Sequence, residues 1–414
     1  MFKSIILFIF IIPVFVFGQE THWIEFGSAR VNITPQKPIH MSGYAGRKIP
    51  STGIHDDLHA CTLCFSDTNS KVLFVTADII AFPDELVTEI KQKINHETGI
   101  SESNIFLTAV HNHGGPVVKA YEKNVSDTVE EYVQELQNKI VEIASQASAQ
   151  TRPVKIGYGS GACKMNINRR ATFADGSVWL GRNPDGPCDH EVSVLKIEDK
   201  NGKLLSLFVN WPCHGTASGQ ENYKITGDWP GLAARFLNEK LGDDVVVAVT
   251  AGASANINPI YGPNDNFREI EAVGAHVGEE VFRILRDIET YPVHSIHVLN
   301  KTLTLPGKMG GTGRYTNEVI EKGPDRNINL SLCKIGNFVF SGISGEVMTE
   351  MGMQIKKSSP YQGTFVLTHC NGSSGYICTD KAYKEGGYEV QVTRFWPGVE
   401  KVLTQNVEEM INSL

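Results

Sequence analysis

The feature that most constrains this sequence is a set of apolar, β-branched runs that each end in a polar or glycine-rich turn. The run at 72–80 is VLFVTADII, and the run at 105–110 is IFLTAV, which leads into His111-Asn-His113-Gly-Gly-Pro. Runs of this kind are typical of strands buried on both faces of a sheet. In open α/β sheets, ligands bind beyond the carboxyl ends of such strands. We therefore expect His111 and His113 to lie at a strand end that a ligand can reach.

Helical patterns alternate with these strands. Pro83 precedes a segment with Leu86, Ile90 and Ile94 on one face, and a second amphipathic segment covers about 128–143. The order strand, helix, strand, helix predicts an α/β fold with a mixed, largely parallel sheet flanked by helices. No repeat, linker or low-complexity segment interrupts the pattern, so we expect residues 19–414 to form a single domain.

Charge and the first residues of the chain limit its partners. The chain has 38 basic and 46 acidic side chains, a net charge of -8, and it lacks a basic run, which argues against nucleic acid as the main partner. Residues 1–18 begin with Lys3 in a short polar segment, continue in an apolar run and end with small residues, which is the pattern of a signal peptide. An uncleaved membrane anchor is the alternative, but the run is shorter than the ~20 residues of a spanning helix. We expect an exported protein, periplasmic or secreted, without stable membrane insertion.

Eight cysteines are spread over the whole chain, which is not the pattern of a small disulfide-stapled scaffold. Cys61-x-x-Cys64 has no second pair at zinc-site spacing, so we assign these two residues to a strand. One or two disulfides remain open, because export permits them and the sequence does not give their connectivity.

Three later segments also place polar side chains just beyond apolar, strand-like runs. They are His214, a small-residue turn that contains Asn256 and Asn258, and Glu346. Two histidines, one carboxylate and an open position form a common catalytic zinc site. His111, His214 and Glu346 are therefore candidate metal ligands. They are far apart in sequence, so this prediction depends on the tertiary convergence of the strand ends.

Arg169 and Arg170 lie in a glycine-rich stretch at 154–179. Adjacent arginines in a loop are most often solvated. The planar guanidinium is also suited to bidentate binding of a carboxylate, sulfate or phosphate. Both interpretations remain open, and both residues are candidate substrate contacts.

Several motifs, in order along the chain, resemble those of the neutral/alkaline ceramidase family. They are MSGYAG, VTADI, AVHNHGGP, NINRR, WPCHGTASG with ITGDWPG, SGEVMTEMG and GYICTDKAY. The resemblance runs from about Gly27 to the last residue. It implies the catalytic domain of that family without the C-terminal β-sandwich that follows it there. It also implies a zinc ion held by His111, His214, Glu346 and Tyr376, with His113 as the second histidine and Arg169 as a substrate-side arginine.

One departure from the family pattern affects the expected reaction. The presumed serine nucleophile of the family is replaced here by Asn258, whose amide cannot be acylated in its place. Ser254 lies four residues earlier and is a poor substitute. This departure and the missing β-sandwich weaken the case for lipid amide hydrolysis.

The leading hypothesis from sequence is therefore a metal-dependent dehydratase, a hydro-lyase similar to exported relatives that act on ulvan. Its substrate would be the non-reducing-end uronic acid of an acidic oligosaccharide, and its product a 4,5-unsaturated uronate. His113 is the expected base, Arg169 and Asn258 assist it, and Arg170 and Asn256 contact the substrate. Two alternatives remain open: a zinc-dependent amidase or esterase related to neutral ceramidase, and a non-catalytic carbohydrate-binding relative. Zinc is the expected metal, although histidine and carboxylate ligands also suit other first-row ions.

Overall fold

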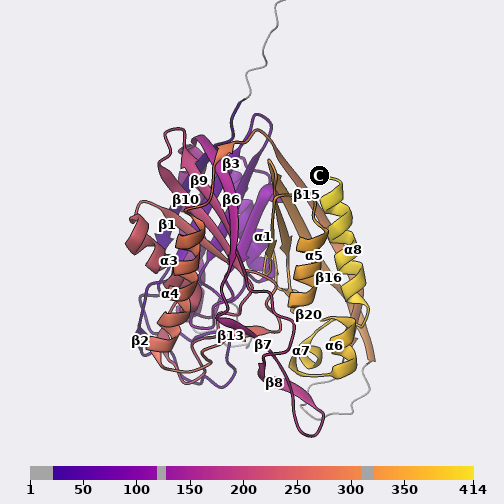
Figure 1. The fold of residues 1–414 in the computed structure, drawn as a ribbon. Coiled ribbons are helices and arrows are strands. Elements are labelled where there is room, and N and C mark those ends of the chain that lie inside the picture. The colour runs from indigo at the N-terminus through magenta and orange to yellow at the C-terminus, as the bar shows by residue number, and fades with distance from the viewer. Residues whose placement is uncertain (1–21, 119–126, 310–320) are drawn as a thin grey trace, which may run out of the picture.

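The protein is described from a computed structural model that covers residues 22–118, 127–309 and 321–414 (Figure 1). The expected signal peptide at 1–18 lies outside the described residues. A nine-stranded sheet has the order β12-β10-β9-β6-β1-β3-β4-β5, with β14 paired to β6. Its strands are β1 (Glu25–Asn32), β3 (His59–Ser66), β4 (Lys71–Ala77), β5 (Ile105–Ala109), β6 (Arg152–Ala162), β9 (Glu191–Asp199), β10 (Leu204–Trp211), β12 (Val246–Ala251) and β14 (Tyr291–Pro292).

A second sheet has the order β15-β16-β17-β19, and three smaller sheets lie near the strand ends. The second sheet consists of β15 (Ile296–Met309), β16 (Glu321–Ile335), β17 (Phe338–Ile343) and β19 (Gly363–Leu367). The small sheets pair β2 (Gly53–Ile54) with β11 (Lys224–Ile225), β7 (Asn166–Thr172) with β8 (Val178–Asn183) and β13 (Ile257–Pro259), and β18 (Glu346–Val347) with β20 (Tyr376–Ile377).

The predicted mixed α/β architecture is confirmed, but parallel pairs do not predominate. In the large sheet, β4 pairs with β5 and β10 with β12 in parallel, whereas the other neighbours are antiparallel. Short turns explain two of the antiparallel pairs, β3 with β4 and β9 with β10, because a tight turn can join only antiparallel neighbours. The turn between β3 and β4 is closed by Asp67, whose carboxylate accepts the backbone N–H groups of Asn69 and Ser70. An Asn201-Gly202 turn joins β9 to β10 in the same way.

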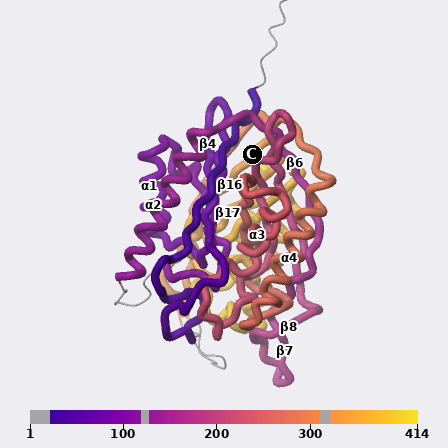
Figure 2. The backbone as a smooth tube through the Cα atoms, turned by 90° about the vertical axis from the view of Figure 1, so that its left-hand side faces the viewer, coloured from indigo at the N-terminus to yellow at the C-terminus, as the bar shows by residue number. Residues whose placement is uncertain are grey.

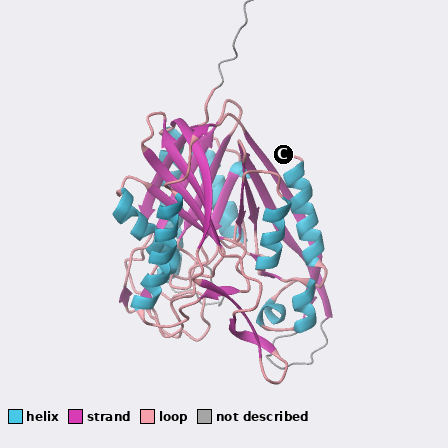
Figure 3. Cartoon of the chain, viewed as in Figure 1, coloured by secondary structure: helices cyan, strands magenta, loops and turns pink. Residues whose placement is uncertain are grey.

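Helices cover the outer faces of both sheets, as Figures 1 and 3 show. On the large sheet, α1 and α2 pack against β3, β4 and β5, and α3 and α4 pack against β9, β10 and β12. On the second sheet, α5 and α8 form a core with β16, β17 and β19. The helices are α1 (Asp84–Thr98), α2 (Asp127–Ala149), α3 (Asp228–Leu241), α4 (Phe267–Ile284), α5 (Thr349–Ser358), α6 (Asp380–Glu385), α7 (Tyr388–Val392) and α8 (Val399–Asn412).

The two sheets pack against each other through a buried aromatic cluster. Phe74 of the large sheet lies with its ring centroid 4.8 Å from that of Phe340 in the second sheet. Phe208 of the large sheet packs edge-on against Phe365 of the second sheet, with ring centroids 5.6 Å apart. Figure 2, turned by 90°, shows the helical layer beside β4. This rigid core fixes the positions from which the loops leave the strands.

All eight cysteines fall among the described residues and are free thiols, so the disulfides left open by the sequence are not present here. Cys61 and Cys64 lie in β3, as expected. Within the described parts of the chain, no helix has both the length and the apolar character needed to cross a bilayer.

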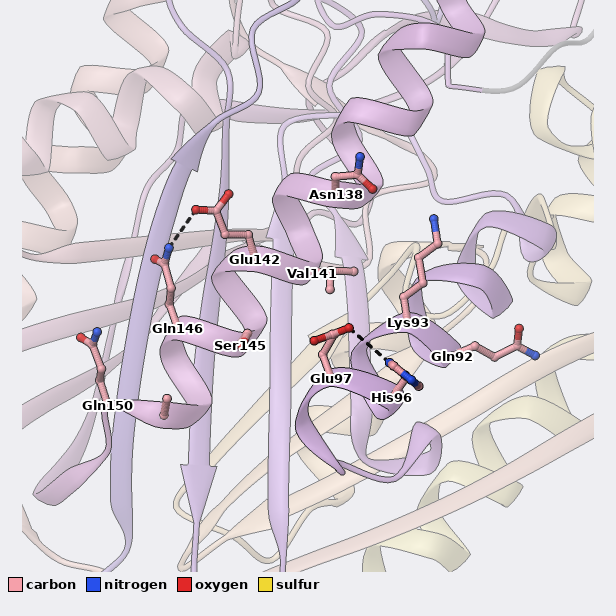
Figure 4. A pocket seen from close by; sticks show the side chains of 11 residues that line it. Gln92, Lys93, His96, Glu97, Asn138, Val141, Glu142, Ser145, Gln146 and Gln150 are labelled. Atoms are coloured by element: carbon pink, nitrogen blue, oxygen red, sulfur yellow. Dashed lines mark hydrogen bonds and ion pairs between the residues drawn. The ribbon is translucent and has the colours of Figure 1, made fainter.

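A surface groove of about 800 Å³ lies between α1 and α2 (Figure 4). Its walls carry mostly polar side chains, and two pairs of them interact, His96 with Glu97 and Gln146 with Glu142. None of the side chains singled out from the sequence lines this groove. The candidate site therefore lies elsewhere, at the strand ends.

Candidate metal centre

The loops that follow β5, β10 and β17 bring three predicted ligands together. The Nε2 atom of His111 lies 3.5 Å from Oε2 of Glu346, and Nε2 of His214 lies 3.3 Å from the same oxygen. Glu346 is also in register with Tyr376, because β18 and β20 form a short parallel pair. The predicted convergence of distant segments is thus present in the structure.

Close backbone packing holds the two histidine loops against each other. Asn112 and Gly215 form a parallel bridge, and the N–H of His113 donates to the carbonyl of Gly215 at 2.9 Å. A Cβ atom on residue 215 would lie 2.8 Å from the carbonyl oxygen of His111, so only glycine permits this approach.

The MSGYAG segment supports His113 from the other side. Gly43 has a φ of +92°, and a Cβ atom there would lie 2.4 Å from Nδ1 of His113. Arg47, from the end of the same loop, donates to the carbonyl of His113 at 2.6 Å. This loop is therefore shaped around His113.

Backbone carbonyls set the tautomers of both candidate histidine ligands. Nδ1 of His111 donates to the carbonyl of Ile80 at 2.9 Å, and Nδ1 of His214 donates to that of Ser254 at 2.7 Å. A carbonyl only accepts, so each Nδ1 carries the proton and each neutral ring presents an Nε2 lone pair. This outer-shell arrangement is the one that orients metal-binding histidines.

The protonation states favour a cation between these atoms. Burial lowers the pKa of His111, although Glu346 opposes the shift, and burial together with Arg169 lowers the pKa of His214 well below its usual value. The rings are therefore neutral at neutral pH. The Nε2 of His214 and the Oε2 of Glu346 are then two acceptors in contact, and both are buried without a hydrogen-bond partner. An electron-pair acceptor between them would remove this repulsion.

The distances also fit a metal ion. Ligands about 2.0–2.1 Å from a tetrahedral ion lie about 3.3–3.4 Å from one another. The observed separations of 3.3 and 3.5 Å match that edge length. His111, His214 and Glu346 thus have the donor atoms of a metal site, with two separations that fit one and two neutral imidazoles.

His113 lies beside the candidate ligands, and Tyr376 is the register partner of Glu346. Nε2 of His113 lies 3.3 Å from Nε2 of His111. The hydroxyl of Tyr376 accepts a hydrogen bond from Arg169 at 3.1 Å. Burial raises the pKa of the Tyr376 phenol well above its usual value, and Glu346 acts in the same direction. Without an ion the phenol is therefore neutral.

The two predicted arginines belong to a buried group that we call the arginine–glutamate network. It consists of the buried residues Arg169, Arg170 and Glu389, together with Glu385 at its more exposed edge. Glu389 accepts from Nε of Arg169 at 2.8 Å and from Nη1 of Arg170 at 2.9 Å. Arg170 donates further to Glu385 and to the carbonyl of Gly386. These contacts favour a structural role for Arg170, and its predicted contact with substrate gains no support from them.

The two predicted asparagines have different surroundings. Asn256 is fully buried, accepts from the N–H of Thr349 and donates to Glu350, so it ties the turn after β12 to the start of α5. Its predicted contact with substrate has no support in these bonds. Asn258 accepts from Nη1 of Arg169 at 3.3 Å and therefore lies at the site. Ser254 contacts the site through its backbone carbonyl, which accepts a hydrogen bond from Nδ1 of His214.

Two residues of the site, His369 and Glu389, were not predicted from the sequence. His369 follows β19 as His111 follows β5, and its ring stacks on that of His111. The rule that selected His111 and His214 would have found it. Glu389 carries no such indication, because an acidic residue in a glycine-flanked loop is usually exposed, yet it is 1% exposed.

Asp78, a polar residue in an apolar strand, has a structural role. Its carboxylate accepts the backbone N–H of His59 at 2.8 Å and so joins β3 to β4. Burial raises the pKa of this carboxyl to about 7. Asp228 similarly accepts three backbone N–H groups, two of them in the loop that follows His214.

Comparison with known proteins identifies the family. The sequence profile described as neutral/alkaline non-lysosomal ceramidase, N-terminal, matches residues 25–260, which is more than half of the chain. The chain belongs to this family. Among curated relatives, the neutral ceramidase of Pseudomonas aeruginosa is 26% identical over 264 residues, which are 58% of this chain and 39% of that protein. Neutral ceramidase 1 of Arabidopsis thaliana is 25% identical over 243 residues, or 54% of this chain and 30% of that protein.

Solved ceramidase structures share the fold. A structure described as ceramidase complexed with C2 superimposes with a TM-score of 0.80 at 18% identity, covering 94% of this chain and 75% of that one. The neutral ceramidase of P. aeruginosa gives a TM-score of 0.77 at 17% identity, covering 94% and 74%. The chain spans less than half the length of the curated relatives named above.

These matches correct the expected reaction. The predicted uronate dehydratase is wrong, because the family and the relatives named above are ceramidases, which are hydrolases of an amide bond. The lyase chemistry, the ulvan-type polysaccharide and the acidic oligosaccharide partner are overturned with it. The findings favour the alternative of a metal-dependent amidase related to neutral ceramidase.

Proposed function

We propose that this chain is a zinc-dependent amidase that hydrolyses the N-acyl bond of ceramide-like lipids. One observation carries the proposal. The Nε2 of His214 and the Oε2 of Glu346 are buried 3.3 Å apart with no hydrogen-bond partner, in a chain of the ceramidase family. A desolvated pair of acceptors is costly to maintain unless it binds something.

His111, His214 and Glu346 would hold the ion, with Tyr376 or His113 as a further donor. Nitrogen and oxygen donors of this kind suit zinc. A bound zinc ion supplies Lewis acidity toward a carbonyl oxygen and lowers the pKa of water. The protein's part is to keep His111 and His214 neutral and oriented through their Nδ1–H bonds.

Asn258 favours water over a serine as the attacking group. The amide of Asn258 accepts from Arg169 and cannot form an acyl intermediate. Ser254 is 2% exposed, and its carbonyl orients His214. Nε2 of His113 lies 3.3 Å from Nε2 of His111, so His113 is beside the candidate ligands, and we assign to it the transfer of a proton during the reaction.

Arg169 supplies fixed positive charge beside the candidate ligands. It contacts Tyr376, Asn258 and Glu389 at once, and burial with these partners locks its plane. A preorganised donor of this kind stabilises an oxygen that gains charge during amide hydrolysis.

We also propose that the mature enzyme acts outside the cytoplasm, after removal of residues 1–18, and that residues 19–414 form one catalytic domain. The apolar run after Lys3 supports the first proposal. The interlocking of loops from both sheets at a single site supports the second.

The direct test is hydrolysis of N-acylsphingosines of defined acyl length by zinc-loaded protein, with release of sphingosine measured by mass spectrometry. We expect release that a chelator stops and added zinc restores. His214→Ala should be inactive, whereas His276→Ala, which removes an exposed histidine on α4, should match the unmodified protein. Zinc-loaded, folded protein that releases no sphingosine from any acyl length would contradict the proposal.

The water-attack step has a test of its own. Ser254→Ala should retain activity within a fewfold, because its backbone carbonyl remains in place to accept from His214. A complete loss of activity in a folded, zinc-loaded Ser254→Ala protein would instead assign the attack to a serine.

A further inference from the structure

His369 is a buried histidine of this site that the proposed reaction does not use. It follows β19, is 3% exposed and has a φ of +53°. Its Nε2 atom is buried and has no hydrogen-bond partner. Both a left-handed backbone at a non-glycine residue and an unpaired buried nitrogen cost stability, and such costs concentrate at functional sites.

The backbone around His369 is tied to the strand that carries His111. The carbonyl of His369 accepts from the N–H of Ala109 at 3.3 Å, and Cys370 forms a bridge with Thr108. Asn371 exchanges two hydrogen bonds with Leu107, one through its backbone N–H and one through its side-chain oxygen. The position of His369 relative to His111 is therefore fixed by a short ladder along β5.

Distance alone would make His369 a metal ligand, because one of its ring nitrogens lies within 4.8 Å of donor atoms on His111 and Glu346. The ring planes exclude this for the ion that His111 binds. The two rings are stacked with centroids 3.9 Å apart and planes only 12° from parallel. An imidazole nitrogen binds a metal along its in-plane lone pair, and two stacked parallel planes cannot both contain the same ion.

We propose that His369 is a substrate-contacting residue, whose free ring nitrogen holds an oxygen of the bound amide or of its acyl product beside Glu346. This inference rests on the proposed amidase function for the identity of that oxygen. Amide and carboxylate oxygens only accept hydrogen bonds, so the bound oxygen would accept from an N–H of His369 and would not be shared with the Glu346 carboxylate, which lies within 4.8 Å of a His369 ring nitrogen. Stacking on His111 fixes the ring, so that the nitrogen meets the bound group without reorganisation.

The test uses acetohydroxamate, a small metal-binding amide analogue, titrated calorimetrically into zinc-loaded protein. His369→Phe keeps an aromatic ring to stack on His111 and removes both nitrogens. We expect it to retain zinc at the level of the unmodified protein and to bind acetohydroxamate about tenfold more weakly, as loss of one hydrogen bond predicts. His369→Asn, which tolerates a positive φ, should show the same loss of affinity and serves if the Phe variant does not fold.

The control is His276→Asn, which removes an exposed imidazole on α4. It should change neither the zinc content nor the affinity for acetohydroxamate. Unchanged acetohydroxamate affinity in both His369 variants would overturn the proposal, because His369 would then contact nothing that binds. Loss of zinc from His369→Phe would also overturn it, since His369 would then be a ligand. Neither outcome depends on ceramide turnover, so failure of the amidase proposal is distinguishable from failure of this one.

Discussion

Two buried polar groups lie next to each other at the strand ends, and they use their polar atoms in opposite ways. In the arginine–glutamate network, both guanidinium groups are paired with carboxylates or carbonyls. In the group formed by His111, His113, His214, His369 and Glu346, which we call the histidine–glutamate cluster, buried atoms have no hydrogen-bond partner. They are Nδ1 of His113, Nε2 of His214, Nε2 of His369 and Oε2 of Glu346.

This difference distinguishes a structural role for the arginine–glutamate network from a ligand-binding role for the histidine–glutamate cluster. A fully paired buried network fixes the positions of its members, and breaking it by removal of one partner is strongly destabilising. Unpaired buried atoms lower stability instead and are kept where they bind a ligand. The network therefore holds Arg169 in place, whereas the cluster carries the unpaired atoms that a metal ion and a substrate would contact under the proposed function.

The largest expected effect comes from the cluster. His214→Ala removes one of two oriented nitrogen donors, so metal affinity should fall by more than the roughly 10- to 100-fold that loss of an outer-shell partner costs. Metal-dependent activity should disappear while the fold of the metal-free protein persists. Zinc content by elemental analysis and unfolding of the metal-free protein measure the two effects separately. Full zinc occupancy in this variant would remove His214 from the ligand set.

The matching change in the network should act on stability. Glu389→Gln leaves two buried guanidinium groups without their shared carboxylate, and we expect a loss of about 3–5 kcal/mol in the free energy of unfolding. Denaturant unfolding of the zinc-free protein measures it. Glu385→Gln is the control, because Glu385 is more exposed and should cost about 1 kcal/mol or less. Equal costs for the two variants would contradict the shared role assigned to Glu389.

Arg169 contacts Glu389 of the network and Tyr376 beside the cluster. A conservative substitution of Arg169 therefore tests whether this residue acts on catalysis separately from the metal ligands. Arg169→Lys cannot keep the planar contacts with Glu389, Asn258 and Tyr376 together. We expect kcat/KM to fall roughly 100-fold with zinc content unchanged. Loss of zinc in parallel with activity would show that Arg169 acts through the ligands alone.

The smallest effect concerns Asp78, which follows β4 as His111 follows β5 but is paired with a backbone N–H. Burial raises its pKa to about 7. Its contribution to stability is therefore fully present below the usual pKa of an aspartate, about 3.9, and is lost as pH rises through 7. Asp78→Asn should remove that loss, so its stability relative to the unmodified protein should increase between pH 5 and pH 8. If the difference in stability between Asp78→Asn and the unmodified protein stays constant over this pH range, the raised pKa does not belong to Asp78.

Much of this arrangement was predictable from sequence, because it follows from local patterns. Apolar runs located β4, β5 and β10, and Pro83 marked the start of α1. The rule that polar residues follow buried strands found His111, His214 and Glu346. Applied once more, it would have found His369.

The rest depended on pairing between distant segments. The share of antiparallel neighbours was not predicted, since strand order is decided by packing between the two sheets rather than by any single run. For Arg169 and Arg170 the sequence left a solvated loop and a contact with substrate both open, because whether an arginine is solvated depends on its partner. That partner, Glu389, is 219 residues beyond Arg170, and no local sequence pattern identifies it as a buried residue.

The reaction was mispredicted for a related reason. The replacement of a serine by Asn258 pointed away from hydrolysis only if the reaction needs that serine. Under the function proposed above, water takes the place of that serine at the candidate ligands, with His113 beside His111. A missing nucleophile therefore argued against one mechanism of amide hydrolysis and not against amide hydrolysis itself.

The central claim is that the unpaired atoms of the histidine–glutamate cluster are a metal site, and X-ray absorption at the zinc edge tests it most directly. The purified chain would be loaded with zinc, freed of excess and measured for stoichiometry and for its ligand shell. The account predicts one zinc ion per chain, surrounded only by nitrogen and oxygen donors at about 2.0–2.1 Å, with scattering from at least two imidazole rings. Substoichiometric zinc, a sulfur-containing shell or a shell without imidazole would contradict it.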